Sequence, residues 1–175
     1  MSSLELVIIV GGEDRAALVD VLRGGFARGR KERHGSRPMA LVRDLFGDLE
    51  EDCREATRKL AGEAWVFQTQ TTVDYFLAEH YRDGELLRRL EFLSEQGGWI
   101  RVEGEDEDWE SLMFEEPEDD GLGDYDAKLA LYEAGEIKVG KFYPYPELYD
   151  LSHILMEIFS LDDIDEWWAG FEALD

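Results

Sequence analysis

Carboxylates interspersed with aromatic side chains are the residues of this sequence best suited to binding chemistry. Between Arg101 and Lys128 the chain has thirteen Asp or Glu residues and no basic residue. Carboxylates attract a basic partner, and aromatic groups supply the apolar area that an interface buries. The pattern predicts a protein-binding surface, with an ordinary solvated loop as the alternative. The predicted contact residues are Trp99, Glu105, Asp106, Glu107, Asp108, Trp109, Glu110, Met113, Phe114 and Tyr125.

Metal chemistry has no comparable pattern. A calcium loop that started at Asp106 would have Ser111 at its glycine position and Pro117 at its closing glutamate. The three histidines have no short ligand spacing, and Cys53 is the only cysteine. We therefore expect no metal ion and no cofactor.

His80 is the best candidate for acid–base catalysis, with Asp74 and neighbouring carboxylates as partners. Glu79 should point to the opposite face of the predicted strand. We expect no catalytic residues, but a fold that brings His80 within hydrogen-bond reach of an acid would favour a small enzyme. A nucleic-acid-mimicking inhibitor is a further alternative.

The formal net charge of -24 limits the partners that the protein can bind. Such a field favours basic proteins and repels nucleic acid and anionic membranes. Adaptation to high salt is an alternative source of the acidity.

The apolar run at residues 4–10 is too short to span a bilayer, so we expect a cytoplasmic protein without a membrane partner. The sequence leaves the oligomeric state open.

The hydrophobic content of 44% predicts a folded core, and we expect a single domain over residues 1–175. Apolar spacing and capping residues predict the elements of the N-terminal part. These are a strand at 4–10, a helix capped by Asp14, a loop at 24–37, a short helix at 38–46 and a helix at 48–61.

The central part predicts an antiparallel meander around residues 64–103. Asp83-Gly84 is typical of a two-residue type I′ turn, which places Arg82 opposite Glu85. Continued without interruption, this register pairs Tyr81 with Leu86, Glu79 with Arg88, Leu77 with Leu90 and Tyr75 with Phe92. The next elements are a strand at 99–103, a helix at 125–134, a strand at 136–143, a helix at 146–159 and a helix from Ser160.

The predicted fold class is α+β: a central antiparallel β-meander with helices packed on one face and a helical C-terminal third. The acidic segment, defined as residues 103–126, should form an edge loop of the sheet.

About forty residues carry a resemblance to small uncharacterised bacterial proteins. The matching pattern begins with Thr71-Thr72-Val73-Asp74-Tyr75-Phe76 and the hairpin Tyr81-Arg82-Asp83-Gly84-Glu85-Leu86-Leu87-Arg88-Arg89-Leu90. It continues with Gly98-Trp99, Val102-Glu103-Gly104-Glu105 and Trp109-Glu110. The chain is also similar in style to immunity proteins of bacterial toxin systems, which are small, acidic and without catalytic motifs. This resemblance implies a non-enzymatic module that neutralises a basic partner such as a toxin.

Overall fold

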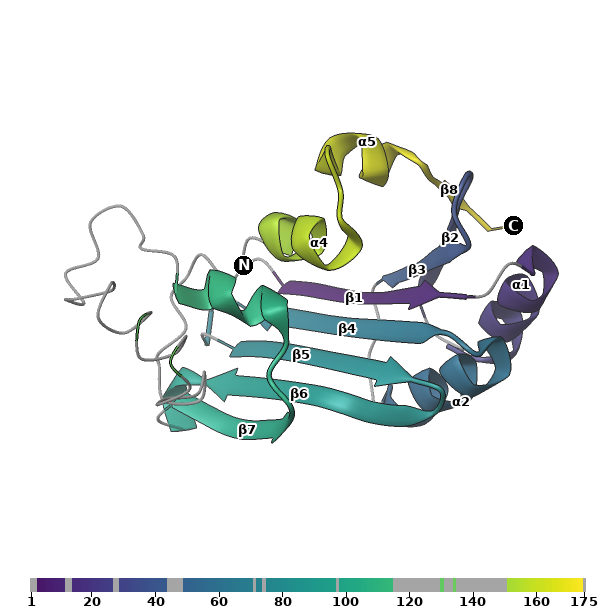
Figure 1. Ribbon diagram of the computed structural model, residues 1–175. Coiled ribbons are helices and arrows are strands. Elements are labelled where there is room, and N and C mark those ends of the chain that lie inside the picture. The colour runs from purple at the N-terminus through teal and green to yellow at the C-terminus, as the bar shows by residue number, and fades with distance from the viewer. Residues whose placement is uncertain are drawn as a thin grey trace.

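The computed structural model describes residues 3–11, 14–26, 29–43, 49–70, 72–73, 75–96, 98–114, 130, 134 and 151–174. Within them the chain forms one antiparallel sheet with the strand order β7-β6-β5-β4-β1-β3-β2-β8 (Figure 1). The strands are β1 (Ser3–Val10), β2 (Arg30–His34), β3 (Met39–Arg43), β4 (Glu63–Gln70), β5 (Tyr75–Arg82), β6 (Glu85–Leu93), β7 (Gly98–Gly104) and β8 (Phe171–Ala173). The helices are α1 (Arg15–Gly24), α2 (Glu50–Leu60), α4 (Leu151–Phe159) and α5 (Ile164–Ala169), with the 3₁₀ segments η1 (Ser94–Gln96) and η2 (Asp108–Phe114).

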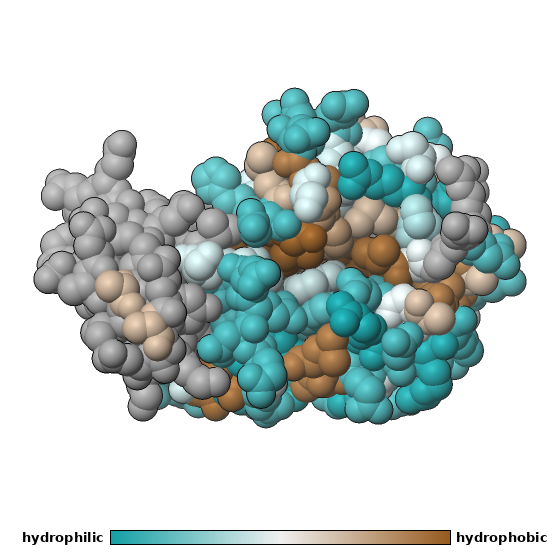
Figure 2. All heavy atoms as spheres, in the orientation of Figure 1, coloured by the Kyte–Doolittle hydropathy of each residue, from teal (hydrophilic) through white to brown (hydrophobic). Residues whose placement is uncertain are grey.

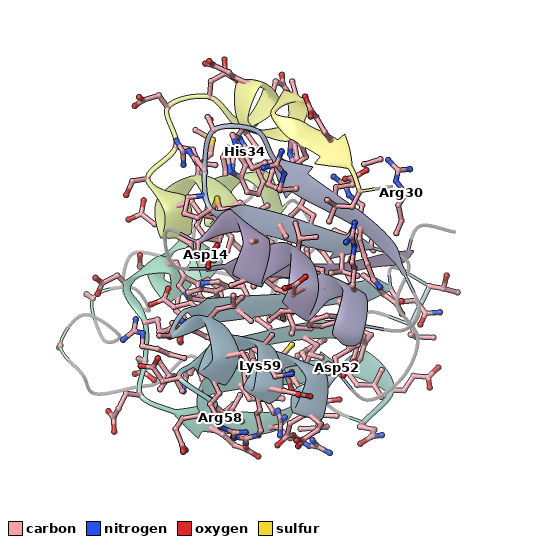
Figure 3. All side chains as sticks on the ribbon, turned by 90° about the vertical axis from the view of Figure 1, so that its right-hand side faces the viewer. Asp14, Arg30, His34, Asp52, Arg58 and Lys59 are labelled. Carbon is pink, nitrogen blue, oxygen red and sulfur yellow. The ribbon has the colours of Figure 1, made fainter. Side chains whose placement is uncertain are left out.

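Helices cover both faces of this sheet. In β1, Leu6 and Ile8 pack into one core with η2, α4 and α5, whereas Val7 and Ile9 pack into a second core with α1 and α2. Side chains alternate across a strand, so an uninterrupted apolar run indicates burial on both sides. The predicted α+β class is confirmed, but the prediction that helices pack on one face is wrong. Figure 3 shows α1 and α2 side by side, with α4 and α5 on another side of the sheet.

Local groups account for the start of α1 and the end of α2. The carboxylate of Asp14 accepts hydrogen bonds from the backbone nitrogens of Ala16 and Ala17 at 2.9 and 3.4 Å, which confirms the predicted N-cap of α1. Helix α2 matches the predicted helix at 48–61 and buries Cys53 and Leu60 on its inner side. It ends at Ala61, whose φ of 46° is left-handed.

The segment between α1 and α2 differs from the prediction. The expected loop at 24–37 contains β2, and the expected short helix at 38–46 is instead β3 over Met39–Arg43. Met39 and Leu41 enter one core while Ala40 and Val42 enter the other. A short apolar run of this kind does not distinguish a buried strand from a buried helix, and pairing with β1 makes it a strand.

The central hairpin has the predicted turn but a different register beyond it. Arg82 lies opposite Glu85 and Tyr81 opposite Leu86, as predicted, and a β-bulge at Leu87 then shifts the pairing by one residue. A shift of one residue moves every later side chain to the other face. The predicted pairs Glu79–Arg88, Leu77–Leu90 and Tyr75–Phe92 are therefore wrong. The observed pairs are His80–Arg88, Glu79–Arg89, Ala78–Leu90, Leu77–Glu91, Phe76–Phe92 and Tyr75–Leu93.

The described residues of the C-terminal third support the predicted helical character only in part. They contain α4 and α5, and the chain then forms β8, which pairs with β2. The predicted helix at 125–134 and strand at 136–143 fall almost entirely outside the described residues. No helix in the described part of the chain is long and apolar enough to cross a membrane.

Strand β7 ends at Gly104, next to the bulge. Gly104 has a φ of 87°, and a Cβ added there would lie 1.8 Å from the carbonyl oxygen of Leu87. Only glycine combines this dihedral angle with so close an approach of two backbones. The turn at Gly104 directs residues 105–114 back across the sheet (Figure 1).

We expect the substitution Gly104→Ala to lower the free energy of unfolding by roughly 2 kcal/mol or more, because backbone strain and a steric clash add. The matched control is Gly24→Ala, where a Cβ would meet nothing within 4 Å. That control should stay within about 1 kcal/mol of the wild type. Urea denaturation measures both changes, and equal stability of the two variants would contradict the close approach at Gly104.

Candidate functional site

The first part of the acidic segment lies on the sheet, where it forms one wall of a cavity. Trp109 of η2 is only 4% exposed and packs edge-on against Trp65 and Phe67, with ring centroids 6.4 Å apart in each case. Figure 1 shows η2 crossing in front of the strands, beside α4. In the same orientation, Figure 2 shows hydrophobic atoms gathered around α4 and the adjoining sheet, with hydrophilic atoms around them.

A buried ion pair holds this segment in place. The guanidinium of Arg88, 2% exposed, donates from Nε and Nη2 to the two carboxylate oxygens of Glu110, each at 2.7 Å. It also donates to Asp106 at 3.0 Å and to the carbonyl oxygen of Gly104 at 2.8 Å. Burial raises the pKa of the Glu110 carboxyl, and the hydrogen bonds from Arg88 oppose this rise. The charged form of Glu110 therefore depends on Arg88.

His80 lies beside this ion pair on β5. Its ring stacks on Trp65 at a centroid distance of 3.7 Å, and Nδ1 lies 2.6 Å from Oε1 of Glu107. The other oxygen of Glu107 accepts a hydrogen bond from Nε1 of Trp109 at 2.7 Å. A carboxylate at this distance assigns a proton to Nδ1, so Nε2 is an acceptor in the neutral ring. Within the described residues Nε2 has no hydrogen-bond partner, and Oε2 of Glu63 is 3.7 Å away.

These groups line a cavity of about 530 Å³, which we call the acidic cavity. Asp106 and Glu107 are engaged by Arg88 and His80, whereas Asp108 and Glu157 are exposed and form no ion pair with another described residue. Nε1 of Trp65 likewise has no hydrogen-bond partner in that part of the chain. The lining residues are Trp65, His80, Arg82, Asp106, Glu107, Asp108, Trp109, Glu157, Ile158 and Ser160.

The predicted contact residues occupy very different environments. Trp109 and Glu110 are buried inside the protein, so they are not available as surface contacts and that part of the prediction does not fit the structure. Trp99 is half-buried, with its ring 5.6 Å from that of Phe92. Glu105, Asp106 and Asp108 are exposed, and Glu107 is partly buried. Met113 and Phe114 belong to η2, and Tyr125 lies outside the described residues.

Residues from other parts of the chain complete the cavity and were not predicted. Trp65, Arg82 and Glu157 come from β4, β5 and α4. Arg88 was expected opposite Glu79, and the bulge places it opposite His80 instead. One sequence signal could have indicated an internal ion pair: Arg88 is a basic residue within a predicted strand of a very acidic protein.

Cysteine and histidine do not form a metal centre in the described ranges, where no group of three or more His, Cys, Asp or Glu residues could hold a metal ion. Cys53 is buried in α2, and burial raises the pKa of its thiol well above the usual value. A thiol in this environment is a poor nucleophile.

Comparison with known proteins adds no relative. No protein-family model, curated protein or solved structure significantly matches this chain. The inference of function therefore depends on the geometry described above.

We expect Arg88→Met to lower the free energy of unfolding by about 3–5 kcal/mol at pH 8, because Glu110 becomes a buried charge without a partner. At pH 5 the loss should be smaller, since burial raises the pKa of Glu110 and the carboxyl can fold in its protonated form. The double variant Arg88→Met/Glu110→Leu should recover most of the stability. Urea denaturation at both pH values tests this, and additive losses in the double variant would argue against the coupling.

Proposed function

We propose that the protein is a non-enzymatic binding module whose acidic cavity accepts a Lys or Arg side chain of a basic partner protein. The observation that carries the proposal is the pair of exposed carboxylates, Asp108 on η2 and Glu157 on α4, at the same cavity. Neither forms an ion pair within the described residues. Two carboxylates that approach from different elements suit one cationic group between them.

The hydrogen-bonding groups of the cavity also favour a cationic guest. The carboxylates of Asp108 and Glu157 offer only acceptors, whereas Nε2 of His80 is buried and does not reach the guest. A guanidinium offers five donors and an ammonium offers three. Arg82 also lines the cavity, but its charge is already paired, because its Nε donates to Glu63 at 2.7 Å.

Buried residues of the acidic segment support the proposed site from inside. Arg88 fixes Asp106 and Glu110, while Trp109 and His80 fix Glu107. Side chains that are held before the partner arrives lose less conformational entropy on binding. In this proposal Trp109 is therefore a positioning residue, and the exposed carboxylates make the contacts.

Long-range electrostatics would assist the association. A net charge of -24 steers a basic protein toward the molecule, and this contribution falls as salt screens the charges. The most concrete version of the proposal is immunity, in which the module covers a basic surface of a toxin. Carboxylates that converge on a cavity favour a protein side chain over mimicry of nucleic acid, which would present an extended charged face.

We expect the double variant Asp108→Asn/Glu157→Gln to lose a basic partner in affinity capture from a lysate of the source organism. The wild-type protein should retain that partner at low salt and hold it more weakly at high salt. The control is Asp20→Asn/Glu51→Gln, which removes two exposed charges from α1 and α2 on the other face. Capture of nothing at any salt concentration, or equal capture by both variants, would contradict the proposal.

An acid–base enzyme is the second candidate, and the contact between His80 and Glu107 at 2.6 Å favours it. Glu107 would orient the ring, and Nε2 would exchange protons with a substrate in the cavity. The side chain of His80 is only 5% exposed, so a substrate needs a small displacement of the wall to reach it. This requirement ranks the enzyme below the binding module.

The substitution His80→Asn separates the two candidates. If the protein is a binding module, we expect partner affinity to change by less than about threefold, because His80 makes no direct contact with the guest. If it is an enzyme, turnover of chromogenic ester, phosphoester or amide substrates should fall by about 100-fold or more. Absence of turnover by the wild-type protein on all three substrate types would count against the acid–base role.

A further inference from the structure

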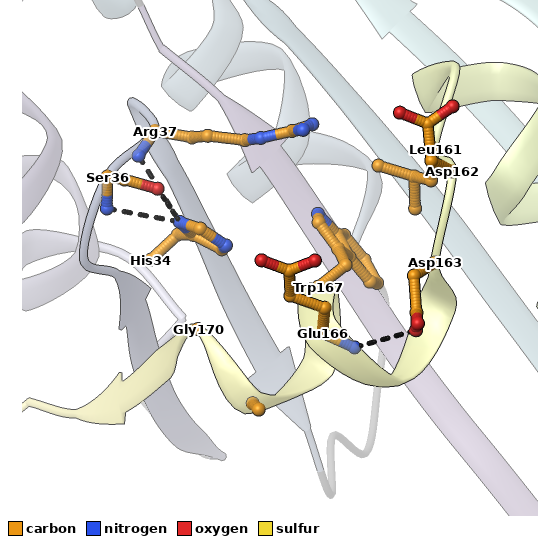
Figure 4. A pocket seen from close by; sticks show the side chains of 10 residues that line it. His34, Ser36, Arg37, Leu161, Asp162, Asp163, Glu166, Trp167 and Gly170 are labelled. Atoms are coloured by element: carbon orange, nitrogen blue, oxygen red, sulfur yellow. Dashed lines mark hydrogen bonds between the residues drawn. The ribbon is translucent and has the colours of Figure 1, made fainter.

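A second cavity, of about 400 Å³, lies between the β2–β3 turn and α5, and we call it the α5 pocket. Figure 4 shows the side chains that line it. Ser36 and Arg37 come from the β2–β3 turn, Asp162 and Asp163 from the connection between α4 and α5, and Glu166 and Trp167 from α5.

His34 joins the two walls of the α5 pocket. Its Nδ1 accepts hydrogen bonds from the backbone nitrogens of Ser36 and Arg37, both at 3.2 Å. On the other side of the ring, Nε2 is so close to Gly170 that a Cβ there would lie 2.3 Å away. Burial, and then the charge of Arg37, lower the pKa of His34. His34 is therefore neutral and buried. Its role is to hold the two walls of the pocket together, and the neighbouring side chains are the ones that can bind a ligand.

Charges of both signs reach the α5 pocket from different elements. Arg37 extends from the turn, and Asp162 and Glu166 lie on the α5 side (Figure 4). None of these three side chains forms an ion pair with another residue of the described ranges. Asp163 differs, because one of its oxygens caps α5 by accepting from the nitrogens of Asp165 and Glu166 at 2.8 and 3.0 Å.

Trp167 supplies an independent indication of a ligand. The residue is 3% exposed, and its Nε1 has no hydrogen-bond partner in the part of the chain that the structure describes. Figure 4 shows the nitrogen-bearing edge of the indole turned toward the space below Arg37. A buried N–H without an acceptor destabilises the folded state, because the group has lost its hydrogen bonds to water. An acceptor group on a bound molecule would remove this penalty.

We propose that the α5 pocket binds a free α-amino acid with a basic side chain, such as L-lysine. The α-carboxylate accepts hydrogen bonds from Arg37 and from Nε1 of Trp167. The ammonium groups lie against the carboxylates of Asp162 and Glu166. Because the pocket has three carboxylates and one guanidinium, a ligand with a surplus positive charge fits it better than a neutral zwitterion. A volume of about 400 Å³ falls within the range of small-molecule sites.

Because of Arg37, this site differs from one that binds cations alone. A diamine would meet the guanidinium with a like charge and would leave Nε1 of Trp167 without an acceptor. An amino acid that lacks the side-chain ammonium would leave one carboxylate without a partner. Tight binding therefore needs both the α-carboxylate and the side-chain ammonium of the ligand. Analogues exist that lack one of these groups and keep the same methylene chain.

The test is isothermal titration of the full chain with L-lysine, L-norleucine, which lacks the side-chain ammonium, and cadaverine, which lacks the carboxylate. We expect L-lysine to bind at least about tenfold more tightly than either analogue. Equal binding of cadaverine and L-lysine would overturn the proposal, because the pocket would then recognise cations alone. Absence of L-lysine binding would overturn it as well.

Two variants assign the ends of the ligand. Arg37→Gln should lower the affinity for L-lysine to that for cadaverine and leave cadaverine binding unchanged or stronger, whereas Glu166→Gln should weaken both ligands. The controls are Arg33→Gln, on the same hairpin, and Asp165→Asn, on α5, neither of which lines the pocket. Unchanged far-ultraviolet circular dichroism establishes that each variant folds. Equal L-lysine affinity of Arg37→Gln and Arg33→Gln would place the carboxylate elsewhere and contradict the assignment.

Discussion

The buried ion pair between Arg88 and Glu110 is the interaction on which the rest of the site depends. A guanidinium that is removed from water requires an anion with good hydrogen-bond geometry, and the acidic segment supplies it in bidentate form. The bulge at Leu87 places Arg88 on this face, and the left-handed turn at Gly104 returns the chain toward it. Glu107 and Trp109 reach His80 and the core because they lie between these fixed points.

The same ion pair shows that some of the acidic residues of this chain serve the interior of the protein and not its surface. Several carboxylates of the acidic segment are bound to internal side chains, so they are not free to contact a partner. Asp106 and Glu110 are bound to Arg88, and Glu107 is bound to His80. The exposed charges that remain at the cavity, Asp108 and Glu157, come from elements that are distant in sequence. Surface chemistry is therefore determined by which carboxylates remain unpaired after folding.

The sequence predicts those features of the fold that are encoded locally. The cap at Asp14, the apolar stripe of α2 and the Asp83-Gly84 turn each need only a few neighbouring residues. The bulge is not predictable in this way, because both registers of the hairpin place apolar side chains opposite one another. The burial of Trp109 was missed for a related reason. A dense group of carboxylates indicates a segment that is exposed to solvent. The positive charge that reverses this expectation belongs to Arg88, which lies on β6, earlier in the chain.

The pairing of β8 with β2 has a consequence for the order in which the sheet is assembled. Glu32, Arg33 and His34 pair with Ala173, Glu172 and Phe171, which are about 140 residues away in sequence. During synthesis the outer edge of β2 therefore stays open while every other strand of the sheet has already left the ribosome. An open edge recruits other chains. Its sequence, Arg-Lys-Glu-Arg-His, is charged, and charged side chains on an edge strand disfavour pairing with other chains until β8 closes that edge.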